Sequence, residues 1–471
     1  MCGRFSDIRQ KSGPCSEKAC PALNSLQGGL PVKAKTAKKL LCKEIQDLEH
    51  CKWLFVNDPR RDFTRKRKLP FERIVRTILS MQGGSIANEL MNVFGIRENL
   101  PTTSAFIQQR GKILPEAFET LFHLFSQDSD EEKTYAGLRL LAVDGSDFVI
   151  ATNPADTDSF FLGAEQKKSY NLLHLNAMYD LVQHVYVDAV LQKRRLADEC
   201  GALVDMVDRS RLNSVLLLAD RGYESYNVLA HIQNKGWKFL IRIKDVNSSG
   251  IASGLDLPDT DEFDIPICLN LTHKQTFDLK QLCQDRNRYK FITPSTRFDF
   301  LPKRSRKHDP AVFFPLSFRI VRFPISDSTF ETVLTNLDQS DFPPSLLKQL
   351  YAMRWGIETS FRDLKYTIGL QHFHAKKVEF VQQEIFARLT MYNFYELITQ
   401  SVVIQQNHRK HAYKVNFSAA VHICRQFFLD ELPPPLIEAM LAKFISPIRP
   451  GRSRPRKLRS KQALCFLYRV A

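Results

Sequence analysis

The stretch VLLLADRGY, from Val215 to Tyr223, decides the expected fold, because five apolar residues lead directly to an aspartate and a turn. The stretch LRLLAVDGS, from Leu138 to Ser146, repeats this arrangement. Short apolar runs of this kind are typical of central strands buried on both faces of a sheet. We therefore expect Asp144 and Asp220 at the carboxyl ends of two strands, where open α/β sheets hold their functional groups.

Further elements are expected around these two runs. Apolar and turn patterns predict strands at 171–179, 184–191 and 238–244, and helices at 197–209 and 225–234. Residues 246–342 follow, and they are rich in β-branched and aromatic residues between turn signals. We interpret that segment as a β-rich insertion into an α/β core, because a structureless connection of such length is uncommon in a compact domain.

A third stretch, YAMRWGIE from Tyr351 to Glu358, is followed by Lys365 and has its ionic residues at helical spacing. In one continuous helix, Tyr351, Arg354, Glu358 and Lys365 would form one stripe opposite an apolar flank. If this helix brings Glu358 to Asp144 and Asp220, three carboxylates can hold one or two Mg²⁺ ions and leave positions open for water and phosphate.

Each acid alone has a simpler interpretation. A single aspartate at a strand end often caps a turn, and an arginine and a glutamate four residues apart usually belong to a solvated helix face. Asp147 is a competing acid beside Asp144, but three residues further along an extended strand it would point to the opposite side. We expect Asp147 to be a turn residue and prefer Asp144 for the site.

The joint pattern resembles the DDE transposases of bacterial insertion sequences. Asp144, the run DRGY from Asp220, and the Y-x2-R-x3-E-x6-K spacing from Tyr351 to Lys365 are similar to the insertion-sequence-four family. The resemblance extends from about Asp62 to the C-terminus. It implies a ribonuclease-H-like catalytic core, a mixed sheet flanked by helices, interrupted by the β-rich insertion and preceded by an N-terminal helical region.

The resemblance also implies function. Asp144, Asp220 and Glu358 would bind catalytic Mg²⁺, with Mn²⁺ as a substitute, for cut-and-paste DNA transposition. The partners would be double-stranded DNA, as terminal inverted repeats and target DNA, and a second protomer in a synaptic homodimer. The residues expected to contact DNA are Tyr351, Arg354, Arg362, Lys365, Lys376 and Lys377. Two alternatives stay open: a catalytically retired DNA-binding protein, and a ribonuclease-H-like nuclease without strand transfer.

Composition agrees with a nucleic-acid partner. The 471 residues contain 67 Lys plus Arg against 51 Asp plus Glu, a formal charge of +16. Basic residues cluster at Arg60 to Lys68, Lys303 to Lys307 and Arg449 to Lys461, where a solvated surface is the alternative. No apolar stretch is long enough to span a membrane, and the ten cysteines form no CxxC pair. We expect a cytoplasmic, nucleoid-associated bacterial protein without a closed zinc site.

The expected organisation has six parts. They are a poorly ordered leader (1–30), a helical and DNA-binding region (31–130), the first part of the catalytic core (131–245), the β-rich insertion (246–342), the second part of the core with the Glu358 helix (343–400), and a C-terminal helical region with a basic tail (401–471). For the region 31–130, a purely structural helical layer is the alternative, because it contains no clear helix-turn-helix pattern. Residues 378–400 are expected to form a long amphipathic helix that closes the core or pairs protomers.

Overall fold

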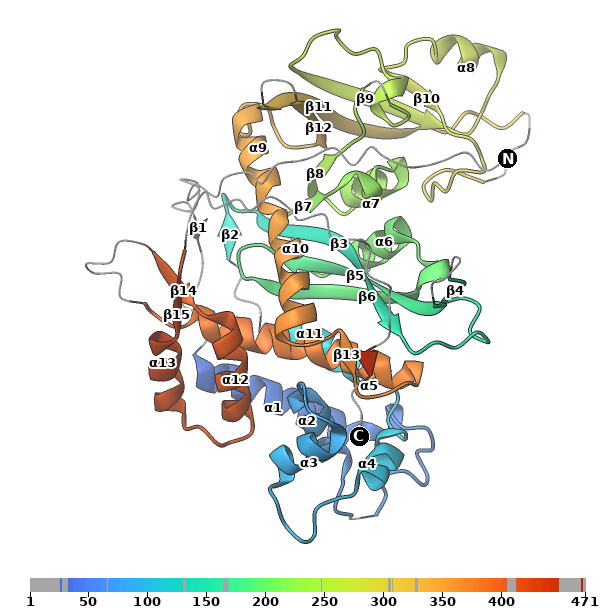
Figure 1. Cartoon of the computed structure of the whole chain (residues 1–471). Helices are drawn as coiled ribbons and strands as arrows, with labels where there is room; N and C mark the ends of the chain where they lie inside the picture. The colour runs from blue at the N-terminus through green and yellow to red at the C-terminus, as the bar shows by residue number, and fades with distance from the viewer. Residues whose placement is uncertain are drawn as a thin grey trace.

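A computed structural model describes residues 33–65, 67–129, 133–163, 168–246, 248–303, 306, 308–326, 329–404 and 412–448, and the backbone of the short strands Leu26–Gln27 and Leu467–Tyr468. A mixed sheet runs through the middle of the molecule, with most helices gathered at one end (Figure 1). Most of the expected leader, and the basic stretch Arg449 to Lys461, lie outside the described residues. Among the described helices, none is long and apolar enough to cross a membrane.

Five strands form the core of the sheet: β3 (Arg139–Ile150), β5 (Tyr170–Asp180), β6 (Val185–Lys193), β7 (Val215–Ala219) and β8 (Lys238–Arg242). Their spatial order is β6, β5, β3, β7, β8. The first three in the chain pair antiparallel, whereas β7 and β8 run parallel to β3 after the crossover helices α6 (Glu199–Arg209) and α7 (Tyr226–Asn234). This is the ribonuclease-H-like order that the sequence predicted.

Strand β3 is longer than expected. Its parallel pairing with β7 ends at Ala142, but its antiparallel pairing with β5 continues through Asp144 and Asp147 to Ile150. The expectation that Asp144 ends its strand is therefore wrong, and so is the interpretation of Asp147 as a turn residue. The physical reason is β5, whose hydrogen bonds hold the Gly145–Ser146 pair extended despite its turn propensity.

The strands of residues 263–335 extend the same sheet instead of closing on themselves. They are β9 (Phe263–Thr272), β10 (Tyr289–Phe291), β11 (Phe314–Ser326) and β12 (Thr329–Thr335), with a short helix α8 (Phe277–Leu282). Strand β12 pairs antiparallel with β8, and the Thr335 hydroxyl donates to the Phe239 carbonyl at 2.7 Å. The β-rich character of this segment is thus as expected, and the sheet joins it directly to the core.

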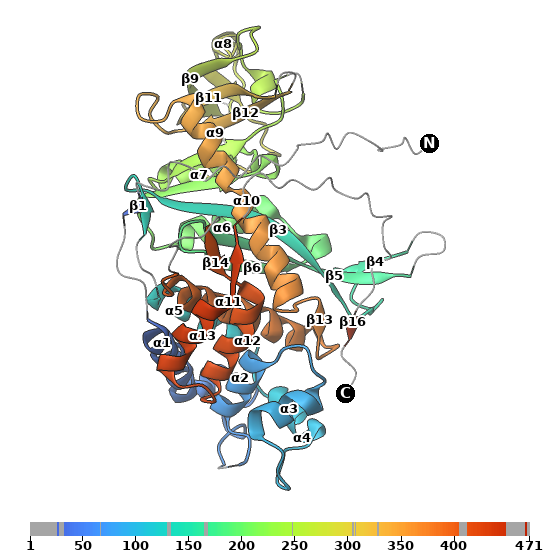
Figure 2. The ribbon, with the colours of Figure 1, turned by 60° about the vertical axis from the view of Figure 1, so that its left-hand side comes forward.

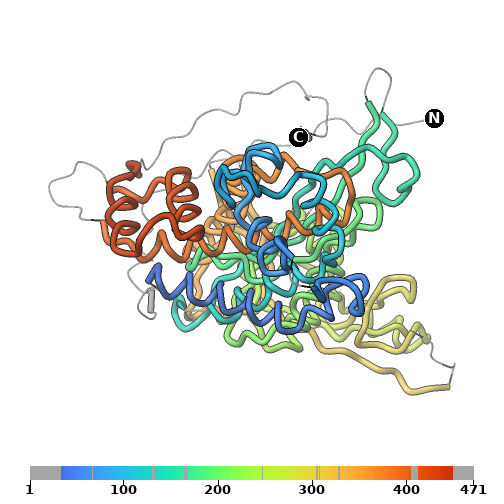
Figure 3. The backbone as a smooth tube through the Cα atoms, turned by 90° about the horizontal axis from the view of Figure 1, so that it is seen from below, coloured from blue at the N-terminus to red at the C-terminus, as the bar shows by residue number. Residues whose placement is uncertain are grey.

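The N-terminal helices are α1 (Ala34–His50), α2 (Phe71–Ser80), α3 (Ile86–Phe94), α4 (Thr103–Arg110) and α5 (Glu116–Asp128). The C-terminal helices α12 (Phe417–Phe428) and α13 (Pro434–Lys443) lie beside them, as the view from below shows (Figure 3). Arg425 of α12 joins the two groups, because its guanidinium donates to the Ser80 carbonyl at 2.6 Å and to the Glu89 carboxylate at 2.8 Å.

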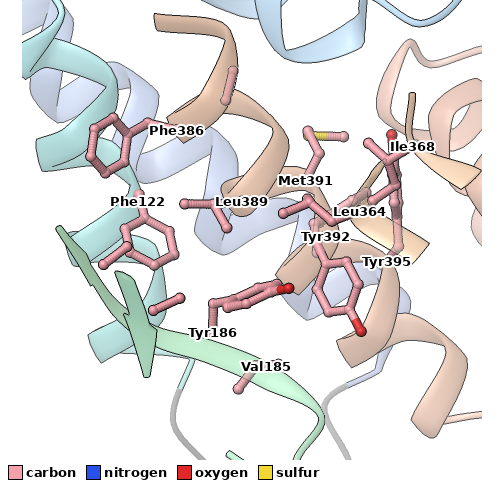
Figure 4. Packing of buried hydrophobic residues seen from close by; sticks show 14 of the residues in the cluster. Phe122, Val185, Tyr186, Leu364, Ile368, Phe386, Leu389, Met391, Tyr392 and Tyr395 are labelled. Atoms are coloured by element: carbon pink, nitrogen blue, oxygen red, sulfur yellow. The ribbon is translucent and has the colours of Figure 1, made fainter. Parts of the chain in front are cut away.

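Helix α11 (Val378–Gln400) is the central helix of this end of the molecule. It was expected to be amphipathic, but it is buried around its whole circumference, with α1, α2 and α5 on one side and β6 on the other. Figure 4 shows Phe386 of this helix beside Phe122 of α5 and Tyr392 beside Tyr186 of β6. Its polar residues are paired internally: Glu384 accepts from Arg110 at 3.0 Å, and the Asn393 side chain accepts from the Tyr186 amide at 2.7 Å. Because distant segments supply these hydrogen-bond partners, the polar residues of α11 can be buried away from water.

The remaining elements are short. They are the strand pairs β1 (Leu26–Gln27) with β2 (Thr134–Tyr135), β13 (His372–Phe373) with β16 (Leu467–Tyr468) and β14 (Tyr413–Val415) with β15 (Ile445–Pro447), the edge strand β4 (Phe160–Phe161), and the 3₁₀ turns Lys52–Leu54, Arg194–Leu196, Arg221–Tyr223 and Ala252–Gly254.

Candidate active site

The structure divides the expected charged helix into three pieces. Helix α9 (Pro344–Met353) ends one residue before α10 (Trp355–Arg362) begins, and a π-helical turn (Asp363–Thr367) follows. At the break, the Arg354 amide donates to the Tyr351 carbonyl at 3.0 Å, the shorter spacing of a 3₁₀ turn. The expectation of one continuous helix with one ionic stripe is therefore wrong. Helix α10 nevertheless lies across β3 (Figure 2).

The three expected acids come from three elements that meet at this crossing. Asp144 lies on β3 just beyond its pairing with β7, Asp220 directly follows β7, and Glu358 lies on α10. The Asp220 carboxylate accepts from the Gly222 amide at 2.8 Å and so caps the turn after its strand. The pKa of Asp144 is raised to about 6, mainly by burial and in smaller part by the negative charges of Asp220 and Glu358, whereas the charge of Arg354 lowers it. Asp144 is therefore close enough to both acids to be repelled by them.

Arg354 lies between two of these carboxylates. Its guanidinium is 2.8 Å from Glu358 Oε1 and 3.8 Å from Asp144 Oδ2, and its side chain is only 12% exposed. Burial lowers the pKa of Arg354, but Tyr351, Asp144 and Glu358 outweigh this effect and raise it overall. A guanidinium presents several donors in a fixed plane, so Arg354 can hold the two carboxylates or, equally, a phosphate.

Two tyrosine hydroxyls are buried beside the acids without a hydrogen-bond partner among the described residues. Tyr351 is 7% exposed, and burial raises its pKa to about 12, with the charge of Asp220 among the contributors. Tyr223 is 1% exposed, and burial raises its pKa, followed by the charges of Asp144, Glu199 and Asp220. Both phenols thus stay protonated. A buried donor without an acceptor is unusual in a folded protein and fits a site that receives oxygen atoms from a ligand.

Lys365 lies in the π-helical turn and contacts the strand that contains Asp144. Its amine donates to the Asp147 carbonyl at 3.0 Å and lies 4.9 Å from the centre of the Phe148 ring. Burial lowers the pKa of Lys365, and the charges of Asp147 and Asp144 oppose that shift. The amine is thus joined to β3, beside the acids.

An ionic cluster on the other side of β3 was not expected from the sequence. His174 on β5 lies 2.6 Å from Asp147 Oδ1 and 3.2 Å from Glu199 Oε1, and Arg194 lies 3.0 Å from Asp147. Burial lowers the pKa of His174, but its hydrogen bond to Asp147 and the nearby carboxylate of Glu199 outweigh burial and raise the pKa to about 9. A Cβ atom at Gly145 would lie 2.5 Å from His174 Nε2, so any other residue after Asp144 would have to displace the buried His174 ring. The only signal in the sequence was the second acid, Asp147.

The other three cations expected to contact DNA lie further away. Arg362 is exposed at the end of α10, whereas Lys376 and Lys377 are exposed ahead of α11 and line a cavity at the far end of β3, with Ile150 to Asn153. The structure therefore gathers Tyr351, Arg354 and Lys365 around the acids and separates Lys376 and Lys377 from them.

The donor atoms suit a hard divalent cation, because all three acids supply oxygen ligands. Within the described ranges, however, no three acid, histidine or cysteine side chains are close enough to share one ion. The Arg354 guanidinium instead lies between Asp144 and Glu358. The three acids are the residues that would hold such a cation, and Arg354 lies between two of them.

Known proteins resemble this chain over most of its length. The family model described as "Transposase DDE domain" matches residues 135–394. The transposase InsG for insertion sequence element IS4 of Escherichia coli (strain K12) is 22% identical over 349 residues, and the match covers 71% of each chain. A solved structure, the piggyBac transposase synaptic complex with hairpin DNA, matches 88% of each chain with a TM-score of 0.45 and 10% identity. The chain therefore belongs to the family of transposase DDE domains, and it is a DNA transposase of the insertion-sequence-four type.

Proposed function

We propose that this transposase cuts the ends of its element and joins them to target DNA at one Mg²⁺-dependent site made by Asp144, Asp220 and Glu358. The observation that supports this most directly is the position of Asp144. Its neighbour Arg354 also holds Glu358, and its pKa is raised mainly by burial and in smaller part by the charges of both other acids. When bound, divalent cations would activate the attacking oxygen and stabilise the leaving oxygen.

The chain's own residues then position the DNA. Asp144 and Glu358 would hold the cations, and Arg354, which lies between them, would bind a phosphate beside the cut, which keeps its charge paired. Tyr351 supplies a hydroxyl that has no partner among the described residues, and it also donates to the DNA backbone. Lys365 holds β3 through the Asp147 carbonyl while its charge faces the same phosphates. Arg362, Lys376 and Lys377 contact the DNA further from the cut.

The site would carry out two reactions in turn, and neither needs a covalent enzyme intermediate. In the first, water forms a bond to the phosphorus at the element end, the bond from phosphorus to the 3′ oxygen breaks, and a 3′ hydroxyl is freed. In the second, that hydroxyl forms a bond to a phosphorus of the target and displaces the target's own 3′ oxygen. Two protomers would hold the two ends in a synaptic homodimer, and the nucleoid is where such a protein would work.

The test uses a labelled duplex that carries the DNA flanking this gene, incubated with Mg²⁺ or with Mn²⁺. We expect cut and joined products with the natural protein and neither product with Asp220→Ala, which should still bind the duplex. Cutting without joining would favour a nuclease, and binding without cutting would favour a retired DNA-binding protein. Unchanged cutting by Asp220→Ala would exclude the assignment of the acids.

A further inference from the structure

A chain of charged side chains connects the strand of Asp144 with the helix α6, on the side of β3 that Asp147 faces. His174 on β5 is the middle of this chain, and its side chain is only 4% exposed. Its Nδ1 atom lies 2.6 Å from Asp147 Oδ1 on β3, and its Nε2 atom lies 3.2 Å from Glu199 Oε1 on α6. Because each ring nitrogen faces a carboxylate, a protonated ring can hold the two acids together. We call Asp147, His174 and Glu199 the His174 bridge.

Glycine amides hold the two aspartates that are proposed as metal ligands. Asp144 Oδ1 accepts from the Gly145 amide at 2.8 Å, and Asp220 Oδ1 accepts from the Gly222 amide at 2.8 Å. The position of each carboxylate therefore depends on the backbone of the glycine that donates to it.

The His174 bridge contacts both of these glycines. A Cβ atom on Gly145 would lie 2.5 Å from His174 Nε2, so the ring packs directly against the backbone of that residue. A Cβ atom on Gly222 would lie 3.6 Å from Glu199 Oε2, which is an ordinary van der Waals distance. Beside Glu199 on α6, the Cys200 thiol donates to the Gly222 carbonyl at 3.6 Å. The bridge thus extends from the backbone next to one aspartate to the turn that contains the other.

The pairing of the strands does not reach the two aspartates. The parallel pairing of β3 with β7 ends at the pair Ala142 and Leu218, so Asp144 and Asp220 each lie two residues beyond it. Since this described ladder stops before the aspartates, contacts outside it have to fix the separation of the two strand ends. The His174 bridge supplies such a contact.

A buried ionic cluster can also serve the stability of the fold alone. In that case its loss would lower the fraction of folded protein and leave the metal affinity of the folded protein unchanged. A partner that orients metal ligands behaves differently, because its loss lowers metal affinity about 10-fold to 100-fold while the ligands themselves are still present. Metal affinity therefore distinguishes the two roles.

We propose that His174 is a positioning residue for the metal site, because it holds β3 and α6 together and so fixes the separation of Asp144 and Asp220. This inference rests on the proposed function only for the identity of the metal ligands. His174 would touch neither the cation nor the DNA. Mg²⁺ demands nearly ideal octahedral geometry, so a change in the separation of two ligands should weaken its binding.

The first test measures Mn²⁺ binding by the full chain without DNA, from the electron paramagnetic resonance signal of free Mn²⁺. We expect His174→Gln to weaken binding on the order of 10-fold. Asp220→Ala should lose the binding, which assigns the signal to this site. The matched control is His231→Gln, because His231 also lies between two carboxylates, those of Asp208 and Asp299, and it should bind Mn²⁺ like the natural protein. Equal affinity in His174→Gln and the natural protein would overturn the proposal.

A second variant tests whether the bridge acts as one unit. Glu199→Gln keeps the shape of the side chain but removes its charge, so it should weaken Mn²⁺ binding by a factor similar to that of His174→Gln. The double variant should lose no more affinity than either single variant, because both residues act through the same contact. Losses that multiply would overturn the bridge. A loss in Glu199→Gln with none in His174→Gln would make Glu199 a metal ligand itself and would also overturn it.

The dependence of cutting on Mg²⁺ separates positioning from a purely structural role. In His174→Gln, the half-saturating Mg²⁺ concentration should rise about 10-fold, whereas the rate of cutting at saturating Mg²⁺ should stay within about threefold of the natural rate. A rate lowered by the same factor at every Mg²⁺ concentration would overturn the positioning role. If circular dichroism shows that His174→Gln does not fold, Asp147→Asn takes its place with the same expectations, since the Asp147 side chain is 42% exposed.

Metal binding and cutting are measured separately, so the two proposals fail separately. If Mn²⁺ binds at Asp220 and His174→Gln weakens it, but the natural protein cuts nothing, the proposed function fails and the positioning role stands. If the natural protein cuts with Mg²⁺ while His174→Gln binds Mn²⁺ equally tightly, the positioning role fails and the proposed function stands.

Discussion

Replacing His174 with glutamine should remove a pH-dependent part of the stability of the sheet. His174 is buried, and its ring lies between Asp147 at 2.6 Å and Glu199 at 3.2 Å, which raise its pKa to about 9. A histidine whose pKa is higher in the folded than in the unfolded chain stabilises the fold. That contribution is complete below the unfolded pKa of about 6.5 and is lost as the pH rises through about 9.

The magnitude follows from the size of the shift. A rise from 6.5 to about 9 corresponds to an upper limit of about 3 kcal/mol, at 1.36 kcal/mol per unit. The side chains of Asp147 and Glu199 are 42% and 35% exposed, so water screens the pair, and we expect about 2 kcal/mol. The free energy of unfolding of the natural protein should therefore fall by about 2 kcal/mol between pH 6.5 and pH 9.

The assay is urea denaturation of both proteins at pH 6.5, 7.5 and 9, followed by circular dichroism. His174→Gln should be less stable at pH 6.5 and should lack most of the fall toward pH 9. The matched control is His231→Gln, because His231 also lies between two aspartates, Asp208 at 3.0 Å and Asp299 at 3.2 Å, and should leave the His174 contribution intact. Equal slopes in the natural protein and His174→Gln would refute the reasoning.

Three other changes test the site and the core. Gly145→Ala places a methyl group 2.5 Å from the His174 ring and should destabilise the protein by about 1–3 kcal/mol, measured as a lower melting temperature; an unchanged melting temperature would contradict the crowding. Glu358→Gln keeps the shape of the side chain but removes its charge, so cutting should fall by at least about 100-fold while binding in EDTA is retained; near-normal cutting would remove Glu358 from the catalytic set. Arg110→Met leaves Glu384 buried without its 3.0 Å partner and should cost about 3–5 kcal/mol in urea denaturation; a loss below about 1 kcal/mol would mean that water or His374 replaces the arginine.

The core could be predicted from the sequence because its main signals, apolar runs and the spacing of charged residues, lie within short segments of the chain. The apolar runs before Asp144 and Asp220 are fully buried in β3 and β7, and the spacing of strands and helices after them has the order that the structure shows. The tyrosine, arginine, glutamate and lysine spacing indicated the family without requiring one straight helix. The spacing of the motif is still informative despite the helix break at Arg354, because Arg354 and Glu358 remain in contact on the same side of α10.

Other features depended on partners that are distant in the chain. Asp147 looked like a turn residue, because nothing within a few residues shows that His174 and Arg194 will pair with it. Helix α11 looked amphipathic, because the partners of its polar residues, Arg110 and Tyr186, come from other segments. The periodicity of a sequence shows only which side chains are polar. Whether a polar side chain bonds to water or to protein depends on how distant segments pack around it.

The sequence by itself therefore determined the fold class and the family and predicted the three acids, because burial on a strand and spacing on a helix are encoded by neighbouring residues. Only the tertiary structure decided that Arg354 lies between Asp144 and Glu358, that Lys365 holds β3, and that His174 lies between Asp147 and Glu199. The physical reason is that charges interact across space, at distances set by how the chain packs and not by how far apart they lie along it.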